Sequence, residues 1–184
     1  MGMKKLFAGV FAVTLLATTL SALDVHAVRA KLSIITARSA APAFSLHNAA
    51  GKATPLSNFR GKPVVLNLWA TACGGCRLEL PDFVKLDKRY RSKGVAVVGV
   101  SLDIMYSDLK NAREGWAQVN PFAKQKGLGY TLLLDDGSVE KAFNVTALPA
   151  TYLIDKSGRI AATYIGVVDA ADLEANVKTL LTER

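Results

Sequence analysis

The chain has 184 residues, of which 51% are hydrophobic, and a formal net charge of +8. This length suits a single domain with a sizeable core. Charged residues of both signs are spread along the sequence without a long basic run, which argues against nucleic acid as a partner. The positive balance allows only a mild attraction to anionic lipid surfaces or acidic proteins.

The first residues have the pattern of a targeting segment. Lys4 and Lys5 precede an apolar stretch over 6–23, and residues 25–27 place small side chains at the two positions that a signal peptidase recognises. We therefore predict a signal peptide over 1–27. An uncleaved membrane anchor is the alternative, because the 18 residues of the stretch reach the short end of a bilayer span. In either case the following domain is exported, to the periplasm or another extracytoplasmic space, soluble or anchored to the inner membrane.

Residues 28–42 show little periodicity and are interpreted as a linker or an irregular lead-in that ends at a proline. We expect the folded domain over 43–184. It begins with a short strand at 43–47, whose residues alternate between apolar and polar, and a short helical turn follows over 55–63.

The centre of the domain is predicted from one apolar run and one helical pattern. Residues 64–69 are apolar apart from Asn67, which is typical of a central strand covered on both faces. Apolar residues at helical spacing follow Cys76, and we expect Pro81 to kink this helix and Gly94 to end it.

The second half alternates strands with helices. The pattern between 103 and 120 allows an added helix through Leu109, Ala112 and Trp116, and Asn120-Pro121 is typical of a helix start. A strand is expected before this region, at 95–102. After it, we expect a strand at 131–134, a short helix at 138–143, a hairpin of strands at 151–155 and 160–165, and a final helix capped by Asp169.

This order of elements predicts an α/β protein with a thioredoxin-like fold: a central mixed β-sheet flanked by helices, with an N-terminal strand extension.

Cys73 and Cys76 are the only cysteines and are separated by two residues. If Cys73 begins the helix, both side chains share a face, and their Cα atoms lie about 5 Å apart, within the ~4.4–6.8 Å that a disulfide requires. A helix start carries unpaired N–H groups and a partial positive charge, which stabilise a thiolate on Cys73, and Arg77 adds a cation. We expect Cys73 to be the attacking sulfur and Cys76, further inside the helix, to be the resolving one.

Other interpretations of the cysteine pair have less support. A disulfide that closes so short a loop removes little chain entropy and is a poor structural bridge. A zinc site needs four ligands, which two cysteines and His47 do not supply. Haem attachment requires a histidine directly after the second cysteine, where this chain has Arg77.

The segment Trp69-Ala70-Thr71, the Cys-x-x-Cys pair, a basic residue, Glu79 and Pro81 resemble the active site of the TlpA/ResA/CcmG family of exported thioredoxin-fold thiol-disulfide oxidoreductases. The Ala-Pro-x-Phe-x-Leu and Leu-Ser-x-Phe-x-Gly-Lys stretches near residues 41–62 resemble its amino-terminal extension. The chain departs from the family pattern at Ala72, usually tryptophan, and at Gly75, often proline or glutamate, and these positions help to tune the redox potential.

The resemblance implies a second half of the site. It implies that Leu148-Pro149 is a cis bond facing the cysteines, and that Trp69, Leu148 and Pro149 form the substrate-binding surface, with the backbone of Leu148 free to pair with an extended client. Thioredoxins proper have a buried aspartate where this chain has Asn67.

Glu79 is the candidate proton-handling group that Asn67 cannot be. It follows Cys76 by three residues, so the carboxylate and the resolving thiol share a helix face. Burial beside sulfur would raise the pKa of this carboxyl. The alternative is a solvated surface glutamate paired with a lysine or arginine.

These residues predict an enzyme that exchanges thiols and disulfides without a cofactor or a metal, and that reduces disulfides of selected client proteins. The resemblance implies apocytochrome c or metallochaperone thiols as clients and a membrane thiol-electron transporter as the reductant. An oxidase differing only in potential and a Cu(I)-binding thiol carrier are the rival functions. A peroxidase is disfavoured, because Leu66 and Ala70 stand where peroxiredoxins require proline and threonine.

Overall fold

The computed structural model describes residues 27–33 and 35–183. Within them, seven strands form one mixed sheet in the order β2-β1-β5-β4-β3-β6-β7. β3, β4 and β5 are parallel, and β1, β2, β6 and β7 join the sheet in antiparallel pairs. The strands are β1 (Ser45–His47), β2 (Ala53–Pro55), β3 (Val64–Trp69), β4 (Ala96–Ser101), β5 (Thr131–Leu134), β6 (Ala150–Ile154) and β7 (Ile160–Ile165).

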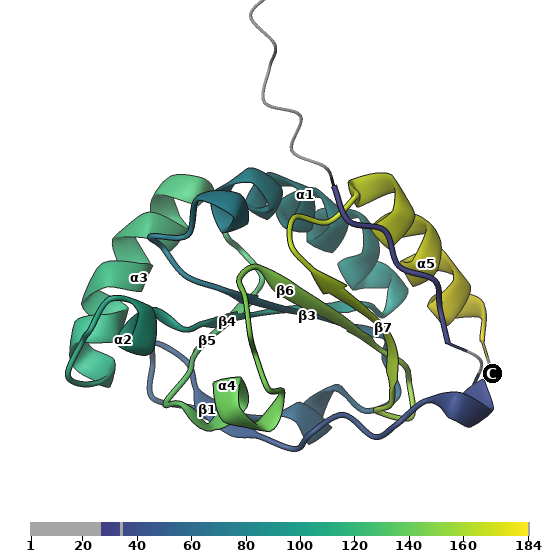
Figure 1. Ribbon diagram of the computed structural model, residues 1–184, viewed down its shortest axis with the longest axis horizontal. Helices are drawn as coiled ribbons and strands as arrows, with labels where there is room; N and C mark the ends of the chain where they lie inside the picture. The colour runs from purple at the N-terminus through teal and green to yellow at the C-terminus, as the bar shows by residue number, and fades with distance from the viewer. Residues whose placement is uncertain (1–26, 34, 184) are drawn as a thin grey trace, which may run out of the picture.

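Helices cover both faces of this sheet. α1, α3 and α5 pack on one face, and α4 lies on the other (Figure 1). The helices are α1 (Gly74–Tyr90), α2 (Asp103–Tyr106), α3 (Ala112–Lys126), α4 (Ser138–Ala142) and α5 (Ala170–Thr182), with 3-10 turns at Ile35–Ala37, Leu56–Phe59 and Arg91–Lys93. The predicted thioredoxin-like α/β fold with an N-terminal strand extension is confirmed; β2 and α2 were not predicted.

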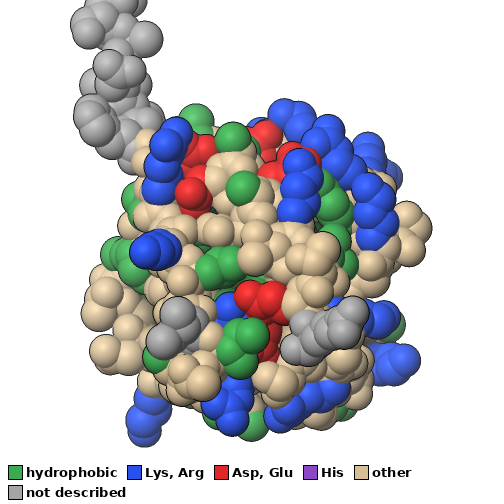
Figure 2. All heavy atoms as spheres, turned by 90° about the vertical axis from the view of Figure 1, so that its right-hand side faces the viewer, with side chains coloured by type: hydrophobic (Ala, Val, Ile, Leu, Met, Phe, Trp, Pro, Cys, Tyr) green, Lys and Arg blue, Asp and Glu red, His purple; other side chains and the backbone are tan. Residues whose placement is uncertain are grey.

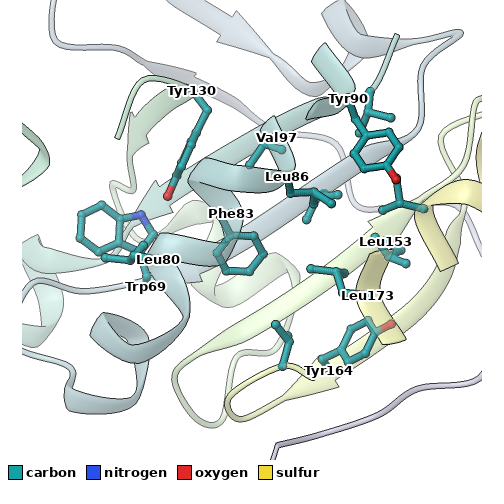
Figure 3. Close-up of a cluster of buried hydrophobic side chains, with 14 of the residues drawn as sticks. Trp69, Leu80, Phe83, Leu86, Tyr90, Val97, Tyr130, Leu153, Tyr164 and Leu173 are labelled. Carbon is teal, nitrogen blue, oxygen red and sulfur yellow. The ribbon is translucent and has the colours of Figure 1, made fainter. Parts of the chain in front are cut away.

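The apolar run of β3 divides between two cores. Val65 and Trp69 face α1, whereas Leu66 and Leu68 face the layer that holds α4. On the α1 side, one row of α1 side chains meets the strands and α5 (Figure 3). Because both faces of β3 are buried, none of its residues is solvent-exposed, which explains the nearly unbroken hydrophobic sequence.

Gly99 in β4 makes room for two rings of this core. A Cβ atom at Gly99 would lie 2.9 Å from Tyr130 Cε2 and 3.0 Å from Trp69 Nε1. Figure 3 shows these two aromatic side chains next to each other at the end of the cluster. A larger residue in the middle of β4 would therefore displace the tryptophan that precedes the cysteine turn.

The prediction that a helix starts at Asn120-Pro121 is wrong. α3 begins nine residues earlier, where Asn111 Oδ1 accepts a hydrogen bond from Glu114 N at 3.1 Å and Glu114 Oε2 accepts one from Lys110 N at 3.0 Å. This reciprocal cap satisfies free N–H groups and outweighs the helix-start signal of proline, so Pro121 lies inside the helix. The predicted end at Gly127 is confirmed, with a left-handed φ of 66°.

The segment predicted as a linker or irregular lead-in follows the edge of the domain. Val28 pairs with Val168, Ser33 N donates to Ala161 O at 2.8 Å, and Ala40 pairs with Arg159. Figure 2 shows this side of the molecule, where acidic and basic side chains lie next to one another. The predicted signal peptide or anchor falls almost wholly outside the described residues. In the described part of the chain, none of the helices has the length and apolarity needed to cross a bilayer.

Candidate active site

The two cysteines form a disulfide at the start of α1. Their Cα atoms are 5.3 Å apart and the S–S distance is 2.08 Å. Cys73 is the N-cap residue, and its Sγ accepts a hydrogen bond from Cys76 N at 3.1 Å. Because the first turn of α1 contains no acidic residue, the partial positive charge of the helix start meets no local countercharge. This arrangement stabilises a negative charge on the sulfur of Cys73 once the disulfide opens.

The two sulfurs differ in their access to solvent. Cys73 is partly exposed, whereas Cys76 is 0% exposed and belongs to the core between α1 and the sheet. A protein-sized disulfide can therefore approach Cys73 and has no path to Cys76. The order of reactivity expected from the sequence agrees with this geometry.

A proline loop lies against the cysteine turn. The peptide bond Leu148–Pro149 is cis, as predicted. A Cβ atom at Gly75, between the cysteines, would lie 3.3 Å from Pro149 Cδ and 3.3 Å from Val167 Cγ2, so the proline ring and the loop after β7 close over this residue. Leu148 is half-buried and packs at the border of the same core as Cys73.

Glu79 is buried one helical turn beyond Cys76. Its side chain is 1% exposed, and it accepts hydrogen bonds from Asn67 Nδ2 at 2.8 Å and from Val168 N at 3.1 Å. Burial raises the pKa of Glu79 to about 7, although the hydrogen bonds from Val168 and Asn67 oppose this rise. The alternative of a solvated surface glutamate is thereby excluded. A carboxyl that titrates near neutral pH is suited to exchange a proton with a thiol.

Asn67 links Glu79 to the sheet. Besides Glu79, the Asn67 amide donates to Thr151 Oγ1 at 3.0 Å, and the pairing of Asn67 with Thr151 in adjacent strands fixes this contact. Asn67 Oδ1 is buried without a hydrogen-bond partner. The position that holds a buried aspartate in thioredoxins proper thus binds the glutamate that α1 supplies.

These features match known proteins. The AhpC/TSA family pattern covers residues 37–163 of the chain. The chain belongs to the AhpC/TSA family. Among curated relatives, the thiol-disulfide oxidoreductase ResA of Geobacillus kaustophilus is 34% identical over 143 residues, which are 77% of this chain and 76% of the relative. The thioredoxin-like protein YneN of Bacillus subtilis is 35% identical over 134 residues, 73% of this chain and 74% of the relative.

Solved structures similar to this chain agree with the sequence relatives. A thiol:disulfide interchange protein from Chlorobium tepidum superposes with a TM-score of 0.67 at 28% identity and covers 78% of this chain and 97% of its own. StoA from Bacillus subtilis has a TM-score of 0.61 at 26% identity and covers 79% of this chain and all of its own, 100%. The predicted kinship with ResA and related thioredoxin-like proteins is confirmed. The chain is a thiol-disulfide oxidoreductase that carries its redox pair at Cys73 and Cys76.

Within the family site, Trp69 occupies a different position from the one expected of a substrate-binding residue. Its side chain is 0% exposed and stacks on Phe122, with ring centroids 5.6 Å apart. Any influence of Trp69 on a client therefore passes through the cysteine turn that it supports. Arg77 packs on the same layer, with its guanidinium 5.5 Å from the Phe122 ring centroid.

The departure at Gly75 has a structural basis. The contacts of 3.3 Å that a Cβ would make to Pro149 and Val167 are tighter than ordinary packing, so a larger residue between the cysteines would displace the proline loop. Ala72 is exposed next to Cys73 and has no such restriction.

Sequence reasoning missed Val168, Thr151 and Asp103 as parts of the site. Val168 and Thr151 act through a backbone N–H and a strand-register contact that no residue pattern reveals. Asp103 had a usable signal, since it is a polar residue that follows the carboxyl end of a buried parallel strand, where sites of α/β proteins gather. Among the described residues, no group of three or more His, Cys, Asp or Glu side chains is placed to hold a metal ion.

Proposed function

We propose that this thiol-disulfide oxidoreductase is exported and reduces disulfides of selected client proteins. The observation that carries the proposal is the asymmetry of the cysteine pair. Cys73 is partly exposed at the helix start, and Cys76 is fully buried behind it. Such a pair can receive a client on one sulfur and keep the second for release.

The reaction has two exchange steps. The Cys73 thiolate attacks a client disulfide, a Cys73–client S–S bond forms, and the other client sulfur leaves as a thiolate that takes up a proton. The Cys76 thiol then loses its proton and attacks Cys73 Sγ. The Cys73–Cys76 disulfide forms, and the second client sulfur leaves as a thiolate. Two electrons have then passed to the client, and a dithiol donor must reopen the Cys73–Cys76 bond.

Glu79 is the proposed acceptor of the Cys76 proton. It lies on the same face of α1 one turn away, and its raised pKa lets it change protonation near neutral pH. Leu148 and Pro149 border the cysteine turn and form the proposed client-binding surface, with the Leu148 backbone offered to an extended client. The buried Trp69 does not reach this surface and acts on it only through the cysteine turn.

The partners and the compartment follow from the family resemblance and from the N-terminal segment. A membrane thiol-electron transporter is the proposed reductant, and apocytochrome c or a metallochaperone are the proposed clients. The basic and apolar pattern of residues 1–27 supports export to the periplasm or another extracytoplasmic space, with release after cleavage or attachment to the inner membrane.

Trapping tests the assignment. Cys76→Ser should accumulate mixed disulfides with client proteins through Cys73, because only the release step is lost, and Cys73→Ser should accumulate none. Non-reducing gels and mass spectrometry of the trapped species identify the clients. Equal trapping by both variants would contradict the assigned roles.

The direction of electron flow is tested separately. A reductase should have a reduction potential nearer to that of thioredoxin, about −270 mV, than to that of DsbA, about −120 mV. Equilibration of the parent protein with glutathione measures this value. A potential near the DsbA value would favour the oxidase.

A further inference from the structure

Asp103 is a buried carboxylate that the reaction above does not use. Asp103 is 0% exposed and stands at the start of α2, shortly after the end of β4. Its carboxylate accepts hydrogen bonds from Thr71 N at 3.0 and 3.1 Å, Thr71 Oγ1 at 2.6 Å, Ser101 Oγ at 2.6 Å and Gln118 Nε2 at 2.8 Å. Ser107 Oγ lies at 3.4 Å. Three separate elements therefore converge on one anion.

Thr71 connects this carboxylate to the attacking cysteine. It lies two residues before Cys73, in the turn where Cys73 N donates to Ala70 O at 3.2 Å. Asp103 binds the Thr71 N–H, and Arg77 Nε donates to the Thr71 carbonyl at 2.7 Å. The N–H and the carbonyl of Thr71 are thus both held, the N–H by Asp103 at the start of α2 and the carbonyl by Arg77 of α1.

The charge of Asp103 is balanced by neutral donors alone. Among the described residues, no lysine or arginine forms an ion pair with it. A buried anion without a countercharge is costly, and neutral hydrogen bonds offset the cost only while their geometry is kept. Any displacement of Thr71 would break several of these bonds together, so the network resists movement of the turn.

We propose that Asp103 is a positioning residue that fixes the turn carrying Cys73 and thereby favours the Cys73–Cys76 disulfide over the dithiol. The inference deepens the proposed function and rests on it only for the identity of the redox pair. In the dithiol, a fixed turn keeps the Cys73 sulfur close to Cys76, which raises the effective concentration of one thiol at the other.

Asp103→Asn tests this role. The amide cannot accept at both positions and carries no charge, so the Thr71 N–H loses at least one acceptor. In the full chain, equilibrated with glutathione and scored by alkylation of free thiols, we expect the constant that favours the disulfide to fall about tenfold, which corresponds to about 30 mV less negative potential.

Asp155→Asn is the matched control. Asp155 is also buried and accepts hydrogen bonds from Ser157 and Arg159, but it follows the far end of β6, beyond the pairing of Ile154 with Val64. This variant should lose stability and keep the glutathione equilibrium constant within twofold. If Asp103→Asn and Asp155→Asn have equal glutathione equilibrium constants at a similar loss of stability, Asp103 has only a structural role.

Thr71→Val supplies an independent arm if Asp103→Asn does not fold. It removes only the hydroxyl, which binds Asp103 and Gln118, and should shift the constant in the same direction by a smaller factor. In the double variant, the fold-change of the constant should be smaller than the product of the two single fold-changes, because both residues take part in the same hydrogen bonds. The inference is overturned if Thr71→Val leaves the constant unchanged, or if the fold-change of the double variant equals the product of the two single fold-changes. If the parent protein equilibrates normally but its Cys76→Ser variant traps no client, the proposed function is refuted instead.

Discussion

Two buried carboxylates, Glu79 and Asp155, show how this fold separates chemistry from structure. Glu79 is 1% exposed and Asp155 7% exposed. Burial raises the pKa of Glu79 to about 7. Burial also acts to raise the pKa of Asp155, but hydrogen bonds from Arg159, Ser157 and Arg38 outweigh it and hold that pKa below its ordinary value.

The difference lies in the donors rather than in the burial. Glu79 receives two neutral donors, the Asn67 amide and the Val168 N–H. Asp155 receives two backbone N–H groups, a hydroxyl and the Arg38 guanidinium, which itself lies between Asp155 and Glu183. A carboxylate that is so fully bound holds the chain together, whereas one that is bound sparsely keeps a proton within reach of the redox pair.

The largest effect is expected from removing the charge that distinguishes the Asp155 site. Arg38→Met leaves Asp155 buried without a countercharge, and the free energy of unfolding should fall by about 3 kcal/mol. Urea denaturation at pH 7 measures this loss. Arg29→Met is the control, since Arg29 lies in the same N-terminal segment but its ion pair with Asp169 is solvent-exposed. Equal losses for both variants would show that the buried pair is no stronger than a surface pair.

The contributions of the two carboxylates to the free energy of unfolding should change with pH in opposite directions. The folded-state pKa of Glu79 is raised from 4.5 to about 7, so its contribution is complete below pH 4.5 and is lost as pH rises through 7, by roughly 3 kcal/mol. The contribution of Asp155 is present above its ordinary pKa and is lost as pH falls.

Denaturation of the oxidised protein between pH 3 and pH 8 separates these contributions. In Glu79→Gln, the free energy of unfolding should no longer decline between pH 4.5 and pH 7. Asp155→Asn should keep this decline, but should have a lower free energy of unfolding than the parent at neutral pH. The comparison fails if Glu79→Gln retains the decline.

The smallest of the three effects is kinetic and tests whether the proton of Glu79 is used. Glu79→Gln keeps the shape of the side chain and removes its titration, so release of a thiol from a preformed Cys73 mixed disulfide should slow by about a hundredfold at pH 7. Stopped-flow measurements from pH 5 to pH 9 should show a rate change near pH 7 in the parent and none in the variant. Asp155→Asn should behave like the parent. Matching profiles for the parent and Glu79→Gln would leave Glu79 with no part in proton transfer.

Much of the fold and the reactive pair could be predicted because the signals are local. The apolar run of β3 and the helical spacing after Cys76 depend on residues within one element. The cis bond at Pro149 came from resemblance rather than from physics, since most bonds before proline are trans. The start of α3 is not decided by one local signal: the pattern through Ala112 and Trp116 lies within α3, but Asn120-Pro121 competes with the stronger cap formed by Asn111 and Glu114.

The sequence by itself determined the distance between the two cysteines, because residues three apart on one helix must share a face and lie within disulfide range. It also placed Glu79 on that face. Only the tertiary structure decided that Glu79 is desolvated, that the Val168 N–H, from a segment 89 residues away, is one of its donors, and that Asp103 holds the turn before Cys73. Helix geometry is set by neighbouring residues, whereas desolvation and hydrogen bonding depend on which distant segments cover a group, and those contacts exist only once the chain has folded.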